Sequence, residues 1–196
     1  MQLIETIRAE DGLLFHLPYH QQRLQRSLDT LGSDALLNLA DVLSPPDQGL
    51  VRCRVLYDVD DILNVTYHPY TPRTINLLQA VVDDTIDYTL KSAERSHLDK
   101  LFSERGEADD ILIIRNGLVS DTTIANIAFF DGAQWITPAS PLLMGTTRQR
   151  LLNEKKLIEQ AIHFDEISRF RGAAIFNAML GFHKIKDGIL SPIIKG

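Results

Sequence analysis

Residues 110–130 read DILIIRNGLVSDTTIANIAFF, and this stretch sets the pattern for the whole chain. Two apolar runs, 110–114 and 118–119, flank Asn116-Gly117, a dipeptide typical of two-residue hairpin turns. A polar loop follows, and the apolar run 124–130 then predicts the next strand. We therefore expect short antiparallel strands joined by tight turns, with a polar segment between them.

The alternation of short apolar runs and turns extends in both directions from this stretch. Pro18 and Gly32 bracket leucines at helical spacing, which predicts an amphipathic helix over 19–31. Further strands are predicted over 3–8, 13–17, 51–57, 62–67, 75–82, 134–137 and 173–176, and further helices over 92–105 and 147–160, with a weaker helical pattern over 36–43. Strands with interspersed helices indicate an α+β fold.

A linker is predicted where prolines interrupt both kinds of pattern. Residues 68–73 read HPYTPR, and two prolines in six residues disfavour a helix as well as a central strand. We therefore expect a small α+β lobe over 1–68, a linker over 69–73 and a larger α+β lobe over 74–196. A chain of 196 residues is long enough to bury a core in each lobe.

Composition narrows the class of function. A formal charge of −6 argues against nucleic acid as the main partner. Cys53 is the only cysteine, and no apolar run has the length of a signal peptide or a membrane span, so we expect a cytoplasmic protein without membrane contact. The histidines show no metal-ligand spacing, and the motifs of acyl hydrolases, dinucleotide enzymes and P-loop proteins are missing, so no metal is expected.

One candidate site is the turn 141–148, PLLMGTTR, which leads into a predicted helix. Free backbone N–H groups at a helix start bind phosphate, and Gly145 would permit close approach at Thr146 and Thr147. The alternative is ordinary capping, in which the Thr146 side chain satisfies the first turn of the helix.

Three charged residues are further candidates. Arg23 offers a planar fork suited to phosphate, although a solvated surface charge is the alternative. Lys91 could attack a carbonyl group if its surroundings lowered its pKa, whereas most lysines are surface residues. Asp121 follows the 118–119 run and could hold a pyridinium nitrogen protonated, whereas a surface turn carboxylate is the alternative.

These candidates lie within five segments whose order and spacing are more specific than any single motif. The segments are LIETIR (3–8), LPYHQQRL (17–24), Leu90-Lys91 with Arg95, GLVSD (117–121) through Asn126-Ile127, and Thr137-Pro138 through GTTR (145–148). Together they resemble the class IV aminotransferase family, the fold-type IV pyridoxal-phosphate (PLP) enzymes. This family includes aminodeoxychorismate lyase, branched-chain aminotransferase and D-amino-acid aminotransferase, and the resemblance covers nearly the whole chain.

The resemblance implies a two-lobed D-amino-acid aminotransferase-like fold, with PLP in the cleft between the lobes and a homodimeric assembly. It implies that Lys91 carries the cofactor as a Schiff base and moves the substrate α-proton. It also implies that Arg23 binds the cofactor phosphate and that the backbone at Thr146 and Thr147 closes the phosphate site.

The resemblance further places Asp121 at the pyridine nitrogen and Asn177, in the segment FNAML (176–180), at the substrate. The family usually has glutamate where this chain has Asp121. It also has about twenty more residues before the segment 3–8, so the resemblance implies an N-terminally shortened form. Lys100 is a rival to Lys91, but it falls within a predicted helix and lacks an arginine four residues later.

The segments HQQRL and NAML look closer to the lyases than to the transaminases. We therefore expect an aminodeoxychorismate lyase-like reaction of folate biosynthesis, from 4-amino-4-deoxychorismate to 4-aminobenzoate and pyruvate. Transamination of a branched-chain or D-amino acid is the alternative, since both reactions would use the same lysine and cofactor. A second alternative, motivated by the shorter chain and by Asp121, is an inactive PLP-binding or partner-binding module.

Overall fold

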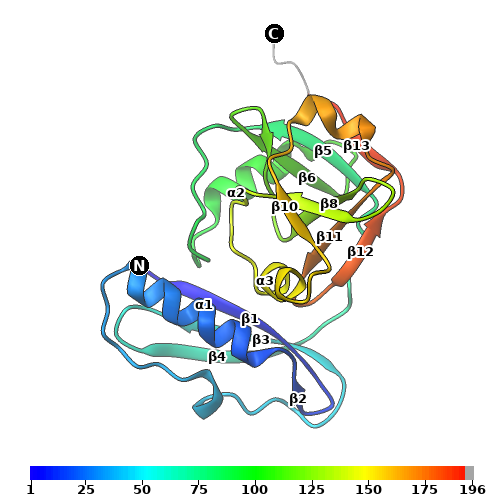
Figure 1. Ribbon diagram of the computed structural model, residues 1–196. Helices are drawn as coiled ribbons and strands as arrows, with labels where there is room; N and C mark the ends of the chain where they lie inside the picture. Colours follow the sequence, from blue (N-terminus) through cyan, green and yellow to red (C-terminus); the bar gives the residue numbers. More distant parts are fainter. Residues whose placement is uncertain (193–196) are drawn as a thin grey trace. The chain divides into compact units, whose positions relative to one another are not determined.

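The computed structural model of the protein describes residues 1–192. Its helices are α1 (Leu17–Thr30), α2 (Ser96–Phe102) and α3 (Thr146–Asn153), with short 3-10 turns η1 (Leu39–Asp41), η2 (Ser103–Arg105) and η3 (Phe164–Arg169). Its strands are β1 (Leu3–Glu10), β2 (Leu13–Leu14), β3 (Leu50–Tyr57), β4 (Ile62–Pro69), β5 (Leu77–Val82), β6 (Asp110–Arg115), β7 (Leu118–Val119), β8 (Asn126–Phe130), β9 (Trp135–Pro138), β10 (Ile158–Gln160), β11 (Gly172–Asn177), β12 (Gly181–Ile185) and β13 (Gly188–Leu190). The α+β prediction is confirmed (Figure 1).

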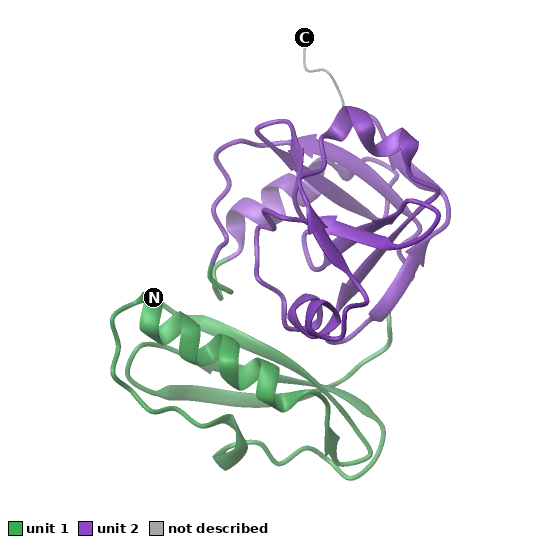
Figure 2. Ribbon diagram, in the orientation of Figure 1, with its two compact units in different colours: residues 1–72, 90–94 green, residues 73–89, 95–196 purple. Residues whose placement is uncertain are grey.

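The chain forms two compact units, which Figure 2 shows in different colours. The first contains residues 1–72 and 90–94, and the second contains residues 73–89 and 95–196. The change of unit after Pro72 lies within the segment 69–73 that we predicted as a linker. The return of 90–94 to the first unit was not predicted.

The first unit is an antiparallel sheet covered on one face by α1. The strand order is β2-β1-β3-β4, and β1 pairs with β3 along its whole length, from Leu3 opposite Tyr57 to Glu10 opposite Leu50. Alternate residues of β1 are buried against α1, whose predicted 19–31 span is confirmed with Pro18 in its first turn. The core of this unit lies between sheet and helix.

The segment 90–94 continues this sheet at the free end of β1. Leu3 and Ser92 form an antiparallel bridge, and the Ala93 N–H donates to the Gln2 carbonyl over 2.9 Å. Because these residues pair with a strand, the predicted helix over 92–105 begins only at Ser96. A pairing partner nearly ninety residues away in the chain outweighs the local helical pattern.

The second unit consists of two sheets that share one core. Their orders are β13-β5-β6-β7 and β10-β9-β8-β11-β12. Leu78 and Leu112 on the first sheet lie in the same apolar cluster as Ile127 and Ile175 on the second. Helix α2 packs on the other side of the first sheet, and α3 packs on the other side of the second (Figure 1). The loops that carry Asp121 and the start of α3 belong to this unit.

The predicted helix over 147–160 is wrong beyond Asn153. Lys155 has a left-handed backbone with a φ of 56°, and the Lys156 N–H bonds back to the Leu151 carbonyl over 2.8 Å. This is the helix-ending geometry that glycine usually provides, so a lysine in this position gives no stop signal in the sequence. The remaining residues 158–160 form β10, parallel to β9.

The sequence patterns also misjudged one short helix and missed two edge strands. The helical pattern over 36–43 yields only the 3-10 turn η1, because a segment this short gains little from helix formation without an extensive packed face. Strands β12 and β13 were not predicted, and both lie at sheet edges where side chains are half-exposed. Among the described residues, no helix is long and apolar enough to cross a membrane.

Candidate active site

Lys91 lies in the segment 90–94, beside the first residues of β1. The Ile4 N–H donates to the Lys91 carbonyl over 2.9 Å, which fixes the lysine backbone to the sheet. The Lys91 residue is partly buried. The rival Lys100 lies exposed on α2. The backbone of Lys91 is thus held by the sheet of the first unit. The attachment of Lys91 to a cofactor stays a prediction.

A buried ionic cluster joins α1 to β1 in the same unit. Arg23 donates to Glu5 through Nε over 2.8 Å to Oε1 and through Nη2 over 2.6 Å to Oε2. His20 Nδ1 lies 2.6 Å from Oε2 of the same carboxylate. Glu5, His20 and Arg23 have exposed fractions of 0%, 1% and 8%. The alternative of a solvated Arg23 is therefore wrong, and its role at a cofactor phosphate stays a prediction.

The charges of this cluster are fixed by mutual contact. Burial disfavours the ionised Glu5 carboxylate, but the Arg23 charge and the hydrogen bonds from His20 and Arg23 outweigh it and lower the pKa of Glu5 to about 2. Burial, together with the Arg23 and Lys91 charges, lowers the pKa of His20. An ionised carboxylate can only accept, so a neutral His20 donates its Nδ1 proton to Glu5. Arg23 is thus held by a carboxylate whose charge offsets its own.

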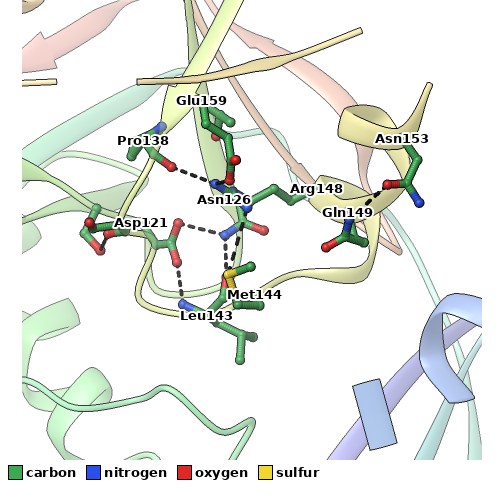
Figure 3. A network of polar contacts seen from close by, with 12 residues as sticks. Asp121, Asn126, Pro138, Leu143, Met144, Arg148, Gln149, Asn153 and Glu159 are labelled. Carbon is green, nitrogen blue, oxygen red and sulfur yellow. Dashed lines mark hydrogen bonds and ion pairs between the residues drawn. The ribbon is translucent and has the colours of Figure 1, made fainter. Parts of the chain in front are cut away.

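Asp121 lies in the loop between β7 and β8 in the second unit. Its Oδ1 accepts from Asn126 Nδ2 over 2.8 Å, and its Oδ2 accepts from the Leu143 N–H over 2.9 Å (Figure 3). The residue is 4% exposed, so the surface-carboxylate alternative is wrong. Burial raises the pKa of Asp121 to about 6, against the opposing hydrogen bonds from Leu143 and Asn126 and the charge of Arg148. A buried acid tuned near neutrality is typical of functional sites.

The first turn of α3 lies in the segment that also bonds to Asp121. Gly145 is the N-cap residue, and within residues 1–192 no side chain caps the helix by a hydrogen bond. The capping alternative for Thr146 is therefore wrong. Thr146 and Thr147 are both buried. An uncapped helix start with buried polar side chains can bind an anion through its backbone N–H groups and the positive end of the helix dipole.

Arg148 adds a buried positive charge to this helix start. It is 1% exposed, donates to the Pro138 carbonyl over 2.9 Å and forms an ion pair with Glu159 (Figure 3). Its Nε has no hydrogen-bond partner among the described residues. Arg148 therefore holds the α3 start against β9 and β10, and its charge favours the ionised form of Asp121.

Three side chains hold the rest of the loop after Asp121. Arg95 Nη2 donates to the Thr123 carbonyl over 2.9 Å, and the Thr123 hydroxyl donates to Asp110 Oδ1 over 2.7 Å. Asn177 Nδ2 donates to the Ile124 carbonyl over 3.0 Å. The Asn177 amide is therefore a structural support of this loop, and its predicted contact with substrate stays a prediction.

The structure brings the predicted residues together in two groups. Arg23 and Lys91 belong to the first unit, and Asp121 lies with Thr146 and Thr147 in the second. Sequence reasoning missed the residues that support these groups: Glu5, His20, Asn126 and Arg148. One signal was available, because Glu5 lies in register with apolar residues of β1, and an acid on a buried face needs a partner. Among the described residues, no cluster of histidine, cysteine or acidic side chains could hold a metal ion.

Comparisons with known proteins identify the family to which this fold belongs. The family model "Amino-transferase class IV" matches residues 85–187. A Haemophilus influenzae protein of uncharacterized function is 38% identical over 91% of this chain and 98% of its own length. A Schizosaccharomyces pombe protein named "Putative aminodeoxychorismate lyase" is 26% identical over 92% of this chain and 86% of its own length.

A solved structure from Haemophilus somnus extends the agreement to three dimensions. That protein, named "putative 4-amino-4-deoxychorismate lyase", is 37% identical with a TM-score of 0.85, and the match covers 92% of this chain and 97% of that one. The family match and the fold therefore define a PLP-dependent enzyme of the fold-type IV class. The chain belongs to the class IV aminotransferase family.

The residues described above fit PLP by their chemistry. PLP presents a phosphate, a ring nitrogen and an aldehyde, and each group needs a different partner. The uncapped start of α3 suits the phosphate, the buried Asp121 carboxylate suits a protonated ring nitrogen, and the Lys91 amine suits the aldehyde. The donor set thus contains one matching group for each end of the cofactor.

Proposed function

We propose that this protein is a PLP-dependent enzyme with aminodeoxychorismate lyase-like activity, converting 4-amino-4-deoxychorismate to 4-aminobenzoate and pyruvate. The observation that carries the cofactor assignment is the buried Asp121 carboxylate, bonded to the same loop that opens the uncapped helix α3. That pairing supplies an acid for a ring nitrogen and an anion site within one rigid network. The lyase assignment rests on the names of the similar Haemophilus somnus and Schizosaccharomyces pombe proteins.

The proposed cofactor would be held by the residues that the family resemblance assigns to it. Arg23 and the backbone N–H groups at Thr146 and Thr147 would bind its phosphate, and Asp121 would hold its ring nitrogen protonated. When bound, PLP supplies an electron sink for the carbon next to the substrate amine. Asp121 would support that chemistry, because an ionised carboxylate would stabilise a protonated ring nitrogen.

Lys91 would first hold the cofactor and then move a proton. The Lys91 amine, when free, would act as the base and acid at the substrate α-carbon. Its backbone bond to Ile4 fixes where the side chain begins, which limits the positions that the amine can reach. Asn177 would contact the substrate at the end of β11.

Transamination is the second candidate function, and the breadth of the matching family favours it. The family model is that of the aminotransferases, and the residues proposed to hold the cofactor serve either reaction. The lyase and the transaminase differ in what leaves the substrate, so a substrate assay separates them. As further parts of the proposal, the protein acts as a homodimer, in the cytoplasm, in folate biosynthesis.

The cofactor proposal is tested by adding PLP to the purified protein and recording its visible absorbance before and after removal of free PLP. We expect retained absorbance that Lys91→Ala abolishes and that Lys100→Ala leaves unchanged. Lys100 is the matched control because it is an exposed lysine outside the proposed site. A wild-type protein that retains no PLP would contradict the enzyme proposal and leave the inactive partner-binding module.

The reaction is tested with two sets of substrates. The first assay follows 4-aminobenzoate and pyruvate formed from 4-amino-4-deoxychorismate. The second offers L- and D-amino acids, including branched-chain ones, with 2-oxoglutarate. We expect turnover in the first assay that Lys91→Ala removes. Turnover confined to the second would refute the lyase proposal and support the transaminase.

A further inference from the structure

Asn126 connects the two parts of the site within the second unit. It is the first residue of β8, and its side-chain amide donates both of its hydrogens. One goes to Asp121 Oδ1 over 2.8 Å, and the other goes to the Leu143 carbonyl over 2.9 Å (Figure 3). The Leu143 N–H in turn donates to the other Asp121 oxygen over 2.9 Å. Three hydrogen bonds thus close a ring of Asp121, Asn126 and Leu143.

The Asn126 side chain also lies directly against Gly145, the N-cap residue of α3. A Cβ atom added at Gly145 would lie 2.0 Å from Asn126 Oδ1, which is far inside van der Waals contact. Gly145 has an extended backbone with a φ of −67°, so it is not needed here for conformational freedom. The glycine is needed because the Asn126 amide occupies the space where a side chain would begin.

The chemistry at position 126 requires an amide. Both acceptors are oxygens, one of them in a buried carboxylate, so the side chain must donate twice and carry no negative charge. An aspartate would place a second acid beside Asp121, and a hydrophobic residue would leave Asp121 with one donor fewer. Asn126 is 6% exposed, so water cannot easily replace the lost bonds.

We propose that Asn126 is a positioning residue that locks the Asp121 carboxylate and the first turn of α3 into one arrangement, with Gly145 as its steric partner. This inference rests on the proposed function, in which Asp121 meets the cofactor nitrogen and the α3 turn meets the phosphate. The inference assigns Asn126 no contact with the cofactor itself. It acts by keeping the two contact points at a fixed separation, so that one rigid ligand can meet both.

The first test compares Asn126→Ala with Thr137→Val. Thr137 lies in the same sheet, is 0% exposed and donates its hydroxyl to the Ile127 carbonyl over 2.8 Å, so its substitution also removes a buried hydrogen bond. We expect Asn126→Ala to weaken PLP binding about tenfold or more, measured by absorbance titration. Thr137→Val should lower the thermal midpoint but keep wild-type PLP affinity.

A measurement without cofactor gives an independent readout. The Asn126 hydrogen bond favours the ionised form of Asp121. The pKa of Asp121, followed by carbon NMR on the apo protein, should therefore rise above about 6 in Asn126→Ala. It should stay unchanged in Thr137→Val, which does not contact this carboxylate. If the pKa of Asp121 does not rise in Asn126→Ala, the Asn126 amide does not control this carboxylate and the inference fails.

The second test uses Gly145, which acts on the same contacts from the helix side. Gly145→Ala must displace the Asn126 amide, so it should weaken PLP binding as Asn126→Ala does. In the double variant the displaced group is absent, so the double should bind PLP about as well as Asn126→Ala alone. Additive losses in the double variant would refute the steric partnership.

The outcomes separate this inference from the proposed function. If the wild-type protein binds no PLP, the proposed function fails. If the wild-type protein binds PLP and the Asn126 and Gly145 variants bind it equally well, the positioning inference fails alone. If Asn126→Ala does not fold, the PLP affinity of Gly145→Ala still tests the inference, because this variant keeps every polar side chain of the network. Wild-type affinity in Gly145→Ala would then refute the inference.

Discussion

Replacing Glu5 by glutamine should reveal how strongly the buried cluster holds α1 to β1. The substitution keeps the shape of the side chain and removes its charge, so Arg23 loses the carboxylate that accepts two of its hydrogen bonds. Breaking a buried ion pair by removing one partner costs about 3–5 kcal/mol. Glu10→Gln is the matched control, since Glu10 lies on the same strand and pairs with Arg8 in a partly exposed position.

The pKa of Glu5 gives a second measure of how much the ionised carboxylate contributes to folding stability. A fall from the ordinary 4.5 to about 2 means that folding favours the ionised form. At about 1.4 kcal/mol per pH unit, this preference contributes about 3 kcal/mol to folding stability. The contribution is complete above the unfolded pKa of 4.5 and is lost as the pH falls towards about 2. The Coulombic and the titration arguments therefore agree in size.

Urea denaturation at pH 7 and at pH 3 measures this contribution. We expect Glu5→Gln to be less stable than wild type by about 3 kcal/mol at pH 7, and the difference should shrink by roughly half at pH 3. Glu10→Gln should change stability by less than about 1 kcal/mol at either pH, because exposed ion pairs contribute little. A Glu5→Gln penalty that is the same at both pH values, or no larger than that of Glu10→Gln, would refute the reasoning.

Other predictions concern the second unit. Because the pKa of Asp121 is raised to about 6, PLP affinity should increase as the pH rises through 6. This increase should be smaller in Asp121→Asn, and identical pH profiles of PLP affinity in the two proteins would contradict the prediction. Arg148→Met should raise the pKa of Asp121, whereas Glu159→Gln, which keeps the arginine, should not; carbon NMR distinguishes them. Thr123→Val removes the hydroxyl that bonds to the buried Asp110 and should lower the unfolding free energy by about 1–3 kcal/mol in urea; wild-type stability would count against that contact.

Local patterns decided the parts of the fold that need few distant contacts. Helix α1 was predicted from Pro18, the spacing of its leucines and Gly32, all within one segment. The hairpin of β6 and β7 was predicted from Asn116-Gly117, whose residues both have positive φ angles. Lys91, Arg23 and Asp121 were chosen from the order of their segments, without knowledge of their surroundings.

Tertiary contacts decided what those patterns left open. The helix predicted over 92–105 does not begin at residue 92, because the pairing of residues 90–94 with β1 offers backbone hydrogen bonds that a helix start would leave unmade. Residues 158–160 form a strand because Lys155 ends α3 and β9 offers a free edge. Burial and partners likewise fix the charge of Glu5 and of Asp121, and a sequence does not reveal either.

The sequence by itself therefore determined an α+β chain, its main helix, its hairpins and the residues that resemble a PLP site. Only the tertiary structure decided that Glu5 neutralises Arg23 and that Asn126 joins Asp121 to the start of α3. The physical reason is the separation along the chain over which each kind of interaction acts. Turn chemistry and periodicity act between near neighbours, whereas an ion pair or a shared amide depends on groups that meet only when distant segments pack.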